Sequence, residues 1–205
     1  MRHDRVVIAY HGCDATVAER LLGGEPFRRS ENDYDWLGAG VYFWEYGADR
    51  ALQFAREQQR RSRITEPAVV GALVQLGNCF DLMDTAFTRE LAEGYRIYRS
   101  MISQIGTTLP RNAGTTPDKK LRRLDCSVLN TYLDWLQRRG AAFDTVRCGF
   151  IEGERAFPGS GIYQQTHIQI AVRNCACIVG TFRPTVQAWM SSTSASSSTT
   201  ISGGR

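Results

Sequence analysis

Lysine is almost absent from this chain. Lys119 and Lys120 are the only two among 205 residues, so arginine supplies nearly all of the positive charge behind the formal net charge of +4. Arginine binds phosphate groups through parallel hydrogen bonds and stacks on flat rings. Biased codon usage produces the same preference. The basic balance therefore favours a nucleic-acid partner without requiring one.

Long apolar runs are also missing. No stretch approaches the roughly 20 apolar residues that a membrane-spanning helix needs. Residues 1–5 lead directly into an apolar strand pattern, so we expect no signal peptide. These two absences favour a cytoplasmic protein with no membrane partner.

The cysteines do not form a metal-binding pattern. Cys175 and Cys177 are separated by one residue, and no pair has the spacing of a zinc ribbon with a histidine cluster nearby. We therefore expect no metal, and free thiols in a reducing compartment. The six cysteines are Cys13, Cys79, Cys126, Cys148, Cys175 and Cys177.

Length and patterning predict one α+β domain over residues 1–190. Residues 191–205 are rich in Ser, Thr and Gly, with almost no apolar content, so we expect a disordered tail. Strand-like runs alternate with amphipathic helical patterns, and those from about 80 to 140 form a helical insert. We expect strands at about 5–10, 40–45, 68–76, 143–151, 162–172 and 177–182, and helices at 14–22 with Asp14 as N-cap, at 48–63, from about 84 to 105, and at 118–139.

A histidine and a glycine close the first strand pattern. His11 and Gly12 follow the apolar run of residues 6–10, which is typical of a short buried strand. Gly12 has no side chain to shield its backbone N–H and C=O, which suits recognition of a carboxamide group. Considered alone, this motif is better explained by a hydrogen-bonded histidine at a strand end.

A glycine turn followed by an aromatic strand forms a second motif, residues 37–44. Gly38 and Gly40 permit positive φ angles and close approach of a ligand to the backbone. The residues that follow have strong β propensity, and alternation places Tyr42 and Trp44 on one face of the strand. That face presents flat rings either to the core or to a flat ligand.

In this order, the two motifs resemble the start of the His-Tyr-Glu signature of ADP-ribosyltransferases of the diphtheria-toxin and poly(ADP-ribose) polymerase type. The resemblance implies NAD as co-substrate and a fold of two packed half-sheets that form an NAD cleft. It implies that His11 bonds the hydroxyls of the adenosine ribose and that the Gly12 backbone holds the nicotinamide carboxamide. It also implies that Tyr42 stacks on the nicotinamide ring.

The third element of the signature departs from the family pattern. Gln169 stands where relatives have a glutamate in a late strand. A carboxylate stabilises the positive charge that develops on the nicotinamide ribose, and a neutral amide does so poorly. Three explanations stay open. Gln169 supports a less demanding reaction, in which the acceptor or a substrate phosphate provides the base; a displaced glutamate replaces it; or the protein binds NAD without turning it over.

We favour a displaced glutamate, with Glu152 ahead of Glu154 and Glu45. Glu152 and Glu154 lie in the glycine-rich loop before the late strand, in the place where relatives position the acceptor. Glu45 follows the aromatic strand directly. A solvated loop charge explains Glu152 equally well.

Other residues are weaker candidates for the same site. Phe54 stands one position away from a second aromatic that relatives carry on the next helix, although a helix-core role competes with this assignment. Ser30, with Arg28 and Arg29, lies in a loop expected to flank the donor, where an arginine can pair with the pyrophosphate. His167 shares a strand face with the late glutamine, as a ligand contact or as a surface imidazole.

The resemblance therefore implies a toxin-like mono-ADP-ribosyltransferase. It would release nicotinamide and move ADP-ribose to a macromolecule, with RNA or DNA favoured over protein, and an antitoxin protein is a plausible partner. The alternatives are a non-catalytic NAD or ADP-ribose sensor and an NAD-dependent RNA 2′-phosphotransferase. The second fits poorly, because only His3, His11 and His167 are available for its histidine-rich site.

Overall fold

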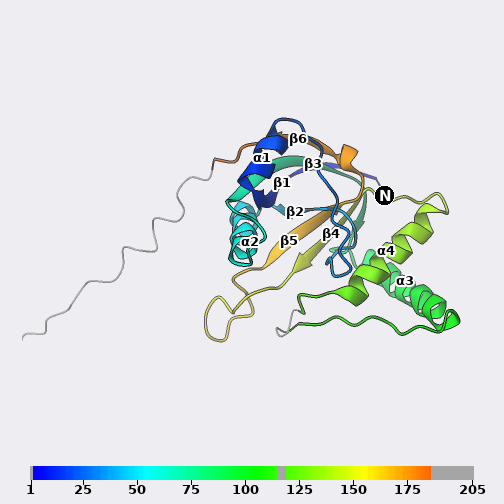
Figure 1. Ribbon diagram of the computed structural model, residues 1–205. Coiled ribbons are helices and arrows are strands. Elements are labelled where there is room, and N and C mark those ends of the chain that lie inside the picture. The colour runs from blue at the N-terminus through cyan, green and yellow to red at the C-terminus, as the bar shows by residue number, and fades with distance from the viewer. Residues whose placement is uncertain (1, 115–118, 186–205) are drawn as a thin grey trace, which may run out of the picture.

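Six strands and four α-helices make up the part of the chain that the structure describes, residues 2–114 and 119–185 of a computed structural model (Figure 1). The elements follow the order β1 (Arg2–Asp14), α1 (Ala15–Leu22), β2 (Val41–Glu45), α2 (Ala48–Arg60), β3 (Pro67–Asp81), α3 (Thr85–Gln104), α4 (Arg123–Gln137), β4 (Thr145–Phe150), β5 (His167–Val172) and β6 (Ile178–Phe182). The predicted α+β class is confirmed.

The strands pair in the order β1-β2-β5-β4-β3-β6, and β1 also pairs with β3. Long ladders join β1 to β3 and join β5 to both of its neighbours, whereas β1 meets β2 at only two residue pairs, Ala9 with Glu45 and Tyr10 with Trp44. Two three-stranded parts, β6-β3-β1 and β2-β5-β4, therefore face each other and are joined by short ladders (Figure 1).

The main core fills the space between these two parts of the sheet. Phe43 of β2 and Ile170 of β5 are fully buried there against Val7 of β1 and Val74 of β3. Burying one such side chain contributes about 1.5–3 kcal/mol. The alternation along β2 thus sends Val41 and Phe43 inward and leaves Tyr42 and Trp44 for the opposite face.

The helical insert covers that opposite face. Leu129 and Leu133 of α4 pack with Phe80 and Val146 in a second core, to which α3 contributes partly buried side chains. The same helix reaches the loop before β2, where Asn130 Oδ1 accepts a hydrogen bond of 2.8 Å from the backbone N–H of Ala39. The insert therefore braces the glycine turn that precedes the aromatic strand.

An N-cap residue starts helix α1, and a glycine in β1 lets helix α2 pack close to the sheet. Asp14 caps α1, as predicted, by accepting a hydrogen bond from the backbone N–H of Thr16. Helix α2 lies so close to β1 that a Cβ on Gly12 would stand 2.2 Å from the carbonyl oxygen of Ala51. Only glycine fits there, so Gly12 sets the distance between α2 and the sheet.

Several predicted boundaries were wrong. Strand β1 extends to Asp14 because it pairs with β3, and β3 extends to Asp81 because it pairs with β4. This pairing keeps residues in the strands although their sequence has no apolar alternation. Conversely, β5 begins at His167 and α4 at Arg123, later than predicted, because polar loops precede both. The predicted tail, 191–205, lies outside the described residues.

The structure bears on two expectations from composition, which concern membrane-spanning helices and free thiols. None of the helices among residues 2–114 and 119–185 combines the length and apolar character that crossing a bilayer requires. All six cysteines are free thiols, and burial raises the pKa of Cys13 and of Cys79 to about 11.

Candidate active site

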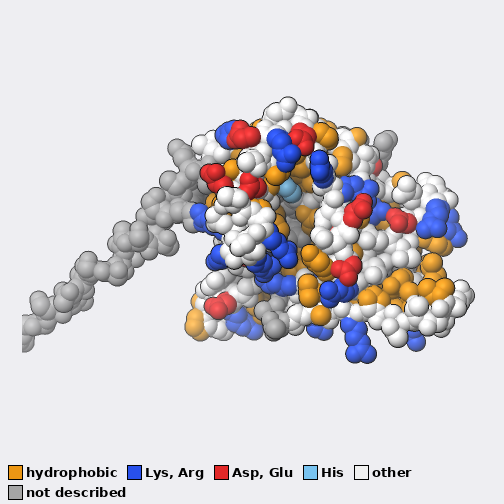
Figure 2. Space-filling view, in the orientation of Figure 1, with side chains coloured by type: hydrophobic (Ala, Val, Ile, Leu, Met, Phe, Trp, Pro, Cys, Tyr) orange, Lys and Arg blue, Asp and Glu red, His pale blue; other side chains and the backbone are white. Residues whose placement is uncertain are grey.

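A cleft of about 820 Å³ opens at the ends of β1 and β2, beside α2 and the loops at 25–40 and 151–166. Figure 2 shows this hollow, with a histidine side chain inside it and Lys and Arg side chains along its margin. The cleft is lined by every residue that the sequence motifs assigned to catalysis or NAD binding, namely His11, Gly12, Ser30, Tyr42, Phe54, Glu152 and Gln169.

His11 enters the cleft from the end of β1. Its Nδ1 lies 2.9 Å from the backbone carbonyl oxygen of Tyr42, which can only accept, so Nδ1 carries the proton. Burial lowers the pKa of His11, although this hydrogen bond opposes the shift. The imidazole is therefore neutral at pH 7, and its Nε2 presents a lone pair that can accept a hydrogen bond from a hydroxyl.

Tyr42 is fixed by its hydroxyl group. The Oη atom accepts a hydrogen bond of 2.7 Å from the backbone N–H of Leu37 and donates one of 2.7 Å to the carbonyl oxygen of Gly38. Burial raises the pKa of Tyr42 well above its usual value, so the phenol keeps its proton. The half-buried ring is held at the cleft wall and is suited to stacking rather than to proton transfer.

Glu152 lines the cleft and has only 4% of its surface exposed. Its Oε2 receives a hydrogen bond of 2.6 Å from Arg50 Nη2, and its Oε1 lies 2.9 Å from Lys120 Nζ. Burial alone would raise the pKa of Glu152, but the two cations outweigh it and hold that pKa below its usual value. The carboxylate is therefore ionised at neutral pH.

Gln169 and His167 extend from β5 beside Glu152. Gln169 pairs in register with Trp44 of β2, is 8% exposed, and its Oε1 is buried with no hydrogen-bond partner. His167 Nδ1 donates to the carbonyl oxygen of Gln165 and lies 3.8 Å from Glu152. His167 is 9% exposed, so the surface reading of this imidazole was wrong: β5 lies between β2 and β4 and is not an edge strand.

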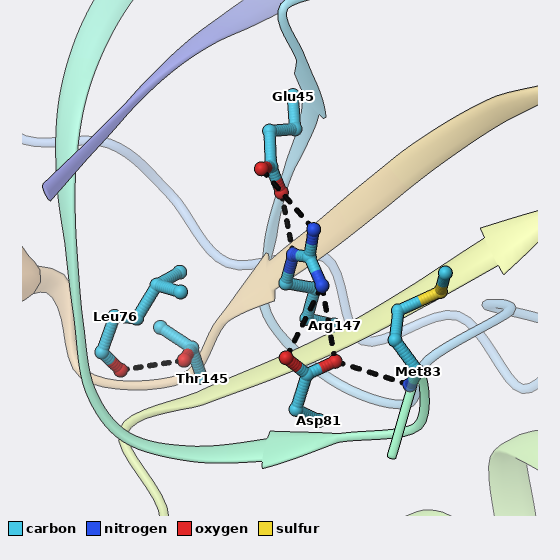
Figure 3. Close-up of polar contacts among 6 residues, drawn as sticks. All are labelled: Glu45, Leu76, Asp81, Met83, Thr145 and Arg147. Atoms are coloured by element: carbon cyan, nitrogen blue, oxygen red, sulfur yellow. Dashed lines mark hydrogen bonds and ion pairs between the residues drawn. The ribbon is translucent and has the colours of Figure 1, made fainter. Parts of the chain in front are cut away.

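The two rival glutamates are not placed in the cleft. Glu45 faces into the sheet, where Arg147 bonds it through two nitrogens at 2.5 and 3.2 Å and also bonds Asp81 (Figure 3). Glu154 is exposed, and its side chain does not line the cleft. Of the three candidates for a displaced carboxylate, Glu152 alone lines the cleft.

The weaker candidates lie around the mouth of the cleft. Phe54 packs on Trp44 with ring centroids 5.0 Å apart and lines the cleft, so it is not confined to the helix core. Ser30 accepts a hydrogen bond of 2.8 Å from the Asn32 side chain. Arg28 lines the cleft, and its neighbour Arg29 is not among the lining residues.

Sequence reasoning missed the two cations that bind Glu152. Arg50 had a readable signal, because it precedes Phe54 by four residues and so shares its helix face. No sequence signal pointed to Lys120. This residue reaches the cleft only because the helical insert packs on the loop before β2. That packing includes a hydrogen bond of 2.9 Å from Trp36 Nε1 to the Lys120 carbonyl oxygen.

Comparisons with protein-family models, with curated proteins and with solved structures found no match for this chain. In the part of the chain that the structure describes, no three His, Cys, Asp or Glu side chains are grouped to hold a metal ion. The function is therefore argued from the cleft itself.

Proposed function

We propose that the protein is an NAD-dependent mono-ADP-ribosyltransferase. One observation carries the proposal: His11, Tyr42 and a buried, ionised Glu152 line one cleft, although they come from three distant parts of the sequence. The two facing parts of the sheet are compatible with the half-sheets of the ADP-ribosyltransferase fold.

NAD would lie along the cleft between His11 and Tyr42. The lone pair on His11 Nε2 accepts a hydrogen bond from an adenosine-ribose hydroxyl, and the Tyr42 ring packs on the nicotinamide. Gly12 and Ser30 line the same wall, where backbone and hydroxyl groups can bond the carboxamide and the ribose. A cleft of about 820 Å³ is within the usual range for ligand sites, about 300–1,000 Å³.

Glu152 would stabilise the transition state. The bond between the nicotinamide nitrogen and the ribose C1′ breaks, nicotinamide leaves with the electron pair, and the sugar acquires oxocarbenium character. The Glu152 carboxylate stabilises that positive charge, and the Gln169 amide hydrogen-bonds a ribose hydroxyl. The acceptor nucleophile then bonds to C1′ and gives its proton to the carboxylate or to water. Polymer formation is not expected, because it relies on the glutamate that Gln169 replaces.

The acceptor would be a macromolecule, with nucleic acid favoured over protein. Arg61 and Arg63 are exposed and line the cleft beyond the end of α2, and Arg28 lines it from the facing loop. Such a basic margin attracts a phosphate backbone. The activity is toxin-like and belongs in the cytoplasm, and an antitoxin protein would be its natural partner.

Transfer of label from NAD tests the proposal. The purified chain is incubated with NAD labelled in the adenylate phosphate and, separately, with RNA, single-stranded DNA or cell protein, while free nicotinamide is measured. We expect nicotinamide release and label in one pool. No release and no label in any pool would contradict the proposal.

A second candidate, an NAD or ADP-ribose sensor, is supported by the charge pairing of Glu152. Both carboxylate oxygens already contact cations, which reduces the charge available to a reacting sugar. Nicotinamide release, measured beside calorimetry of NAD binding, separates the two candidates. A sensor would bind NAD tightly, equally well after Glu152→Gln, and would release no nicotinamide in either form.

A further inference from the structure

Arg50 lines the cleft and carries hydrogen-bond donors that have no partner. Its Nη2 bonds Glu152, whereas its Nε and Nη1 are buried with no partner, and its side chain is only 10% exposed. The guanidinium lies 5.6 Å from the ring centroid of Trp44. The Trp44 Nε1, in a residue that is 3% exposed, is also a buried donor with no partner.

Buried donors without partners are costly, and folded proteins rarely keep several of them together. Arg50 and Trp44 both line the cleft, so these donors belong to residues that border the space a ligand would fill. Three buried nitrogens, with four N–H bonds between them, require acceptors, and among these cleft-lining residues Gln169 Oε1 is the one buried acceptor with no partner. A ligand suited to this corner of the cleft is therefore rich in acceptor oxygens.

The charge of the corner favours an anion as the ligand. Arg50 and Lys120 both contact Glu152, so two positive charges are opposed by one negative charge. Burial lowers the pKa of His167 behind them, so that imidazole adds no charge at pH 7. An excess positive charge that is partly shielded from water is stabilised by an anion that also accepts hydrogen bonds.

We propose that Arg50, Trp44 and Lys120 form a phosphate subsite that binds a backbone phosphate of a single-stranded nucleic-acid acceptor. The source of the phosphate rests on the proposed function, because the subsite adjoins Glu152, where the acceptor must meet the ribose. The exposed Arg61 and Arg63 line the same cleft and provide contacts for neighbouring phosphates of one strand. A phosphoprotein, with a single phosphate, would leave those contacts unused.

Fluorescence anisotropy without NAD tests the subsite. Labelled single-stranded RNA and DNA 12-mers are titrated with the wild type, with Arg50→Gln, with Lys120→Gln and with Arg99→Gln, a control at an exposed arginine of α3 outside the cleft. We expect Arg50→Gln to weaken binding about tenfold or more, and Lys120→Gln about threefold to fivefold. Arg99→Gln should stay within about twofold.

Thermal melting followed by circular dichroism reports folding of each variant. If Arg50→Gln fails to fold, Lys120→Gln decides, because Lys120 is about two-fifths exposed (41% of its side chain) and its removal leaves the Arg50–Glu152 pair in place. Equal binding by Lys120→Gln and Arg99→Gln would then overturn the subsite. Equal binding by a folded Arg50→Gln and by Arg99→Gln would also overturn it.

Two further titrations identify the source of the phosphate. If Arg50→Gln weakens binding of NAD but not of the oligonucleotides, the phosphate belongs to the donor and the acceptor assignment is overturned. If a phosphopeptide binds in an Arg50-dependent way and the oligonucleotides do not, it is overturned as well. Arg50-dependent oligonucleotide binding without nicotinamide release would support the subsite and contradict the proposed enzyme.

Discussion

The Nη2 atom of Arg50 lies 2.6 Å from Oε2 of Glu152, and both side chains are almost completely enclosed. This pair ties α2 to the loop before β5, which are two sides of the cleft. Removing one partner of a buried ion pair leaves an uncompensated charge and costs about 3–5 kcal/mol. The pair therefore holds the cleft together and positions the carboxylate that we assign to catalysis.

Replacing Glu152 with glutamine tests that assignment. The substitution keeps the shape of the side chain and removes the charge that stabilises the reacting ribose. We expect kcat for nicotinamide release to fall about 10²–10³-fold, while the Kd for NAD changes by less than about fivefold. The measurement is steady-state release of nicotinamide per folded molecule, with the folded fraction from urea unfolding and NAD affinity from calorimetry, because loss of the pair with Arg50 also lowers stability.

Two matched substitutions control for a general loss of negative charge. Glu154→Gln changes an exposed residue two positions along the same loop, and it should leave kcat unchanged. Glu45→Gln disturbs the pair with Arg147 inside the sheet, so it should lower stability without removing activity from the folded fraction. A catalytic loss in Glu154→Gln equal to that in Glu152→Gln would refute the role of Glu152.

Two substitutions of Tyr42 distinguish the role of its ring from that of its hydroxyl group. In Tyr42→Phe, the backbone N–H of Leu37 and the carbonyl of Gly38 lose their shared partner, which we expect to cost about 1–3 kcal/mol of unfolding free energy. The ring remains, so NAD should still bind to the folded protein. Tyr42→Ala removes the stacking surface and should abolish binding; calorimetry and urea unfolding check both results.

Gly12 tests the fit between α2 and the sheet. In Gly12→Ala the new Cβ would meet the Ala51 carbonyl at 2.2 Å, so α2 must move and carry Arg50 with it. We expect a loss of about 1–3 kcal/mol in stability and loss of NAD binding. Gly161→Ala is the matched control, because its Cβ meets nothing within 4 Å. An unaltered Tm for Gly12→Ala would show that the contact is not as close as described.

The histidine at the cleft predicts a pH dependence of stability. Burial lowers the pKa of folded His11 below its usual 6.5, so on acidification the unfolded chain takes up the proton first. The contribution of neutral His11 to the free energy of unfolding is complete above pH 6.5. It is lost as the pH falls from 6.5 toward the lowered pKa of the folded state. The difference in unfolding free energy between wild type and His11→Gln should therefore shrink from pH 7.5 to 5.0 in urea titrations. A difference that grows on acidification would contradict a neutral His11.

Short-range sequence patterns were sufficient to predict the aromatic strand that borders the cleft and the start of helix α1. The alternation along β2 separates Phe43 from Tyr42, and the Asp14 cap marks the start of α1, because both depend on residues close in sequence. His11 and Tyr42 line the same cleft because β1 and β2 pair beside them.

Features set by distant packing were not readable. The enclosed position of His167 depends on β5 lying between β2 and β4, which no local pattern specifies. The sequence placed Glu152 only slightly ahead of Glu154, because what distinguishes Glu152 is its contact with Arg50 and Lys120, which the fold brings to it. Lys120 approaches Glu152 because α4 and its preceding loop pack on the segment before β2.

A crystal structure with an unreactive NAD analogue tests the central claim most directly. We predict that the adenosine ribose lies at His11, the nicotinamide lies on the Tyr42 ring, and the ribose C1′ atom faces the Glu152 carboxylate. An analogue bound outside this cleft, or a C1′ atom with Glu152 out of contact, would contradict the account.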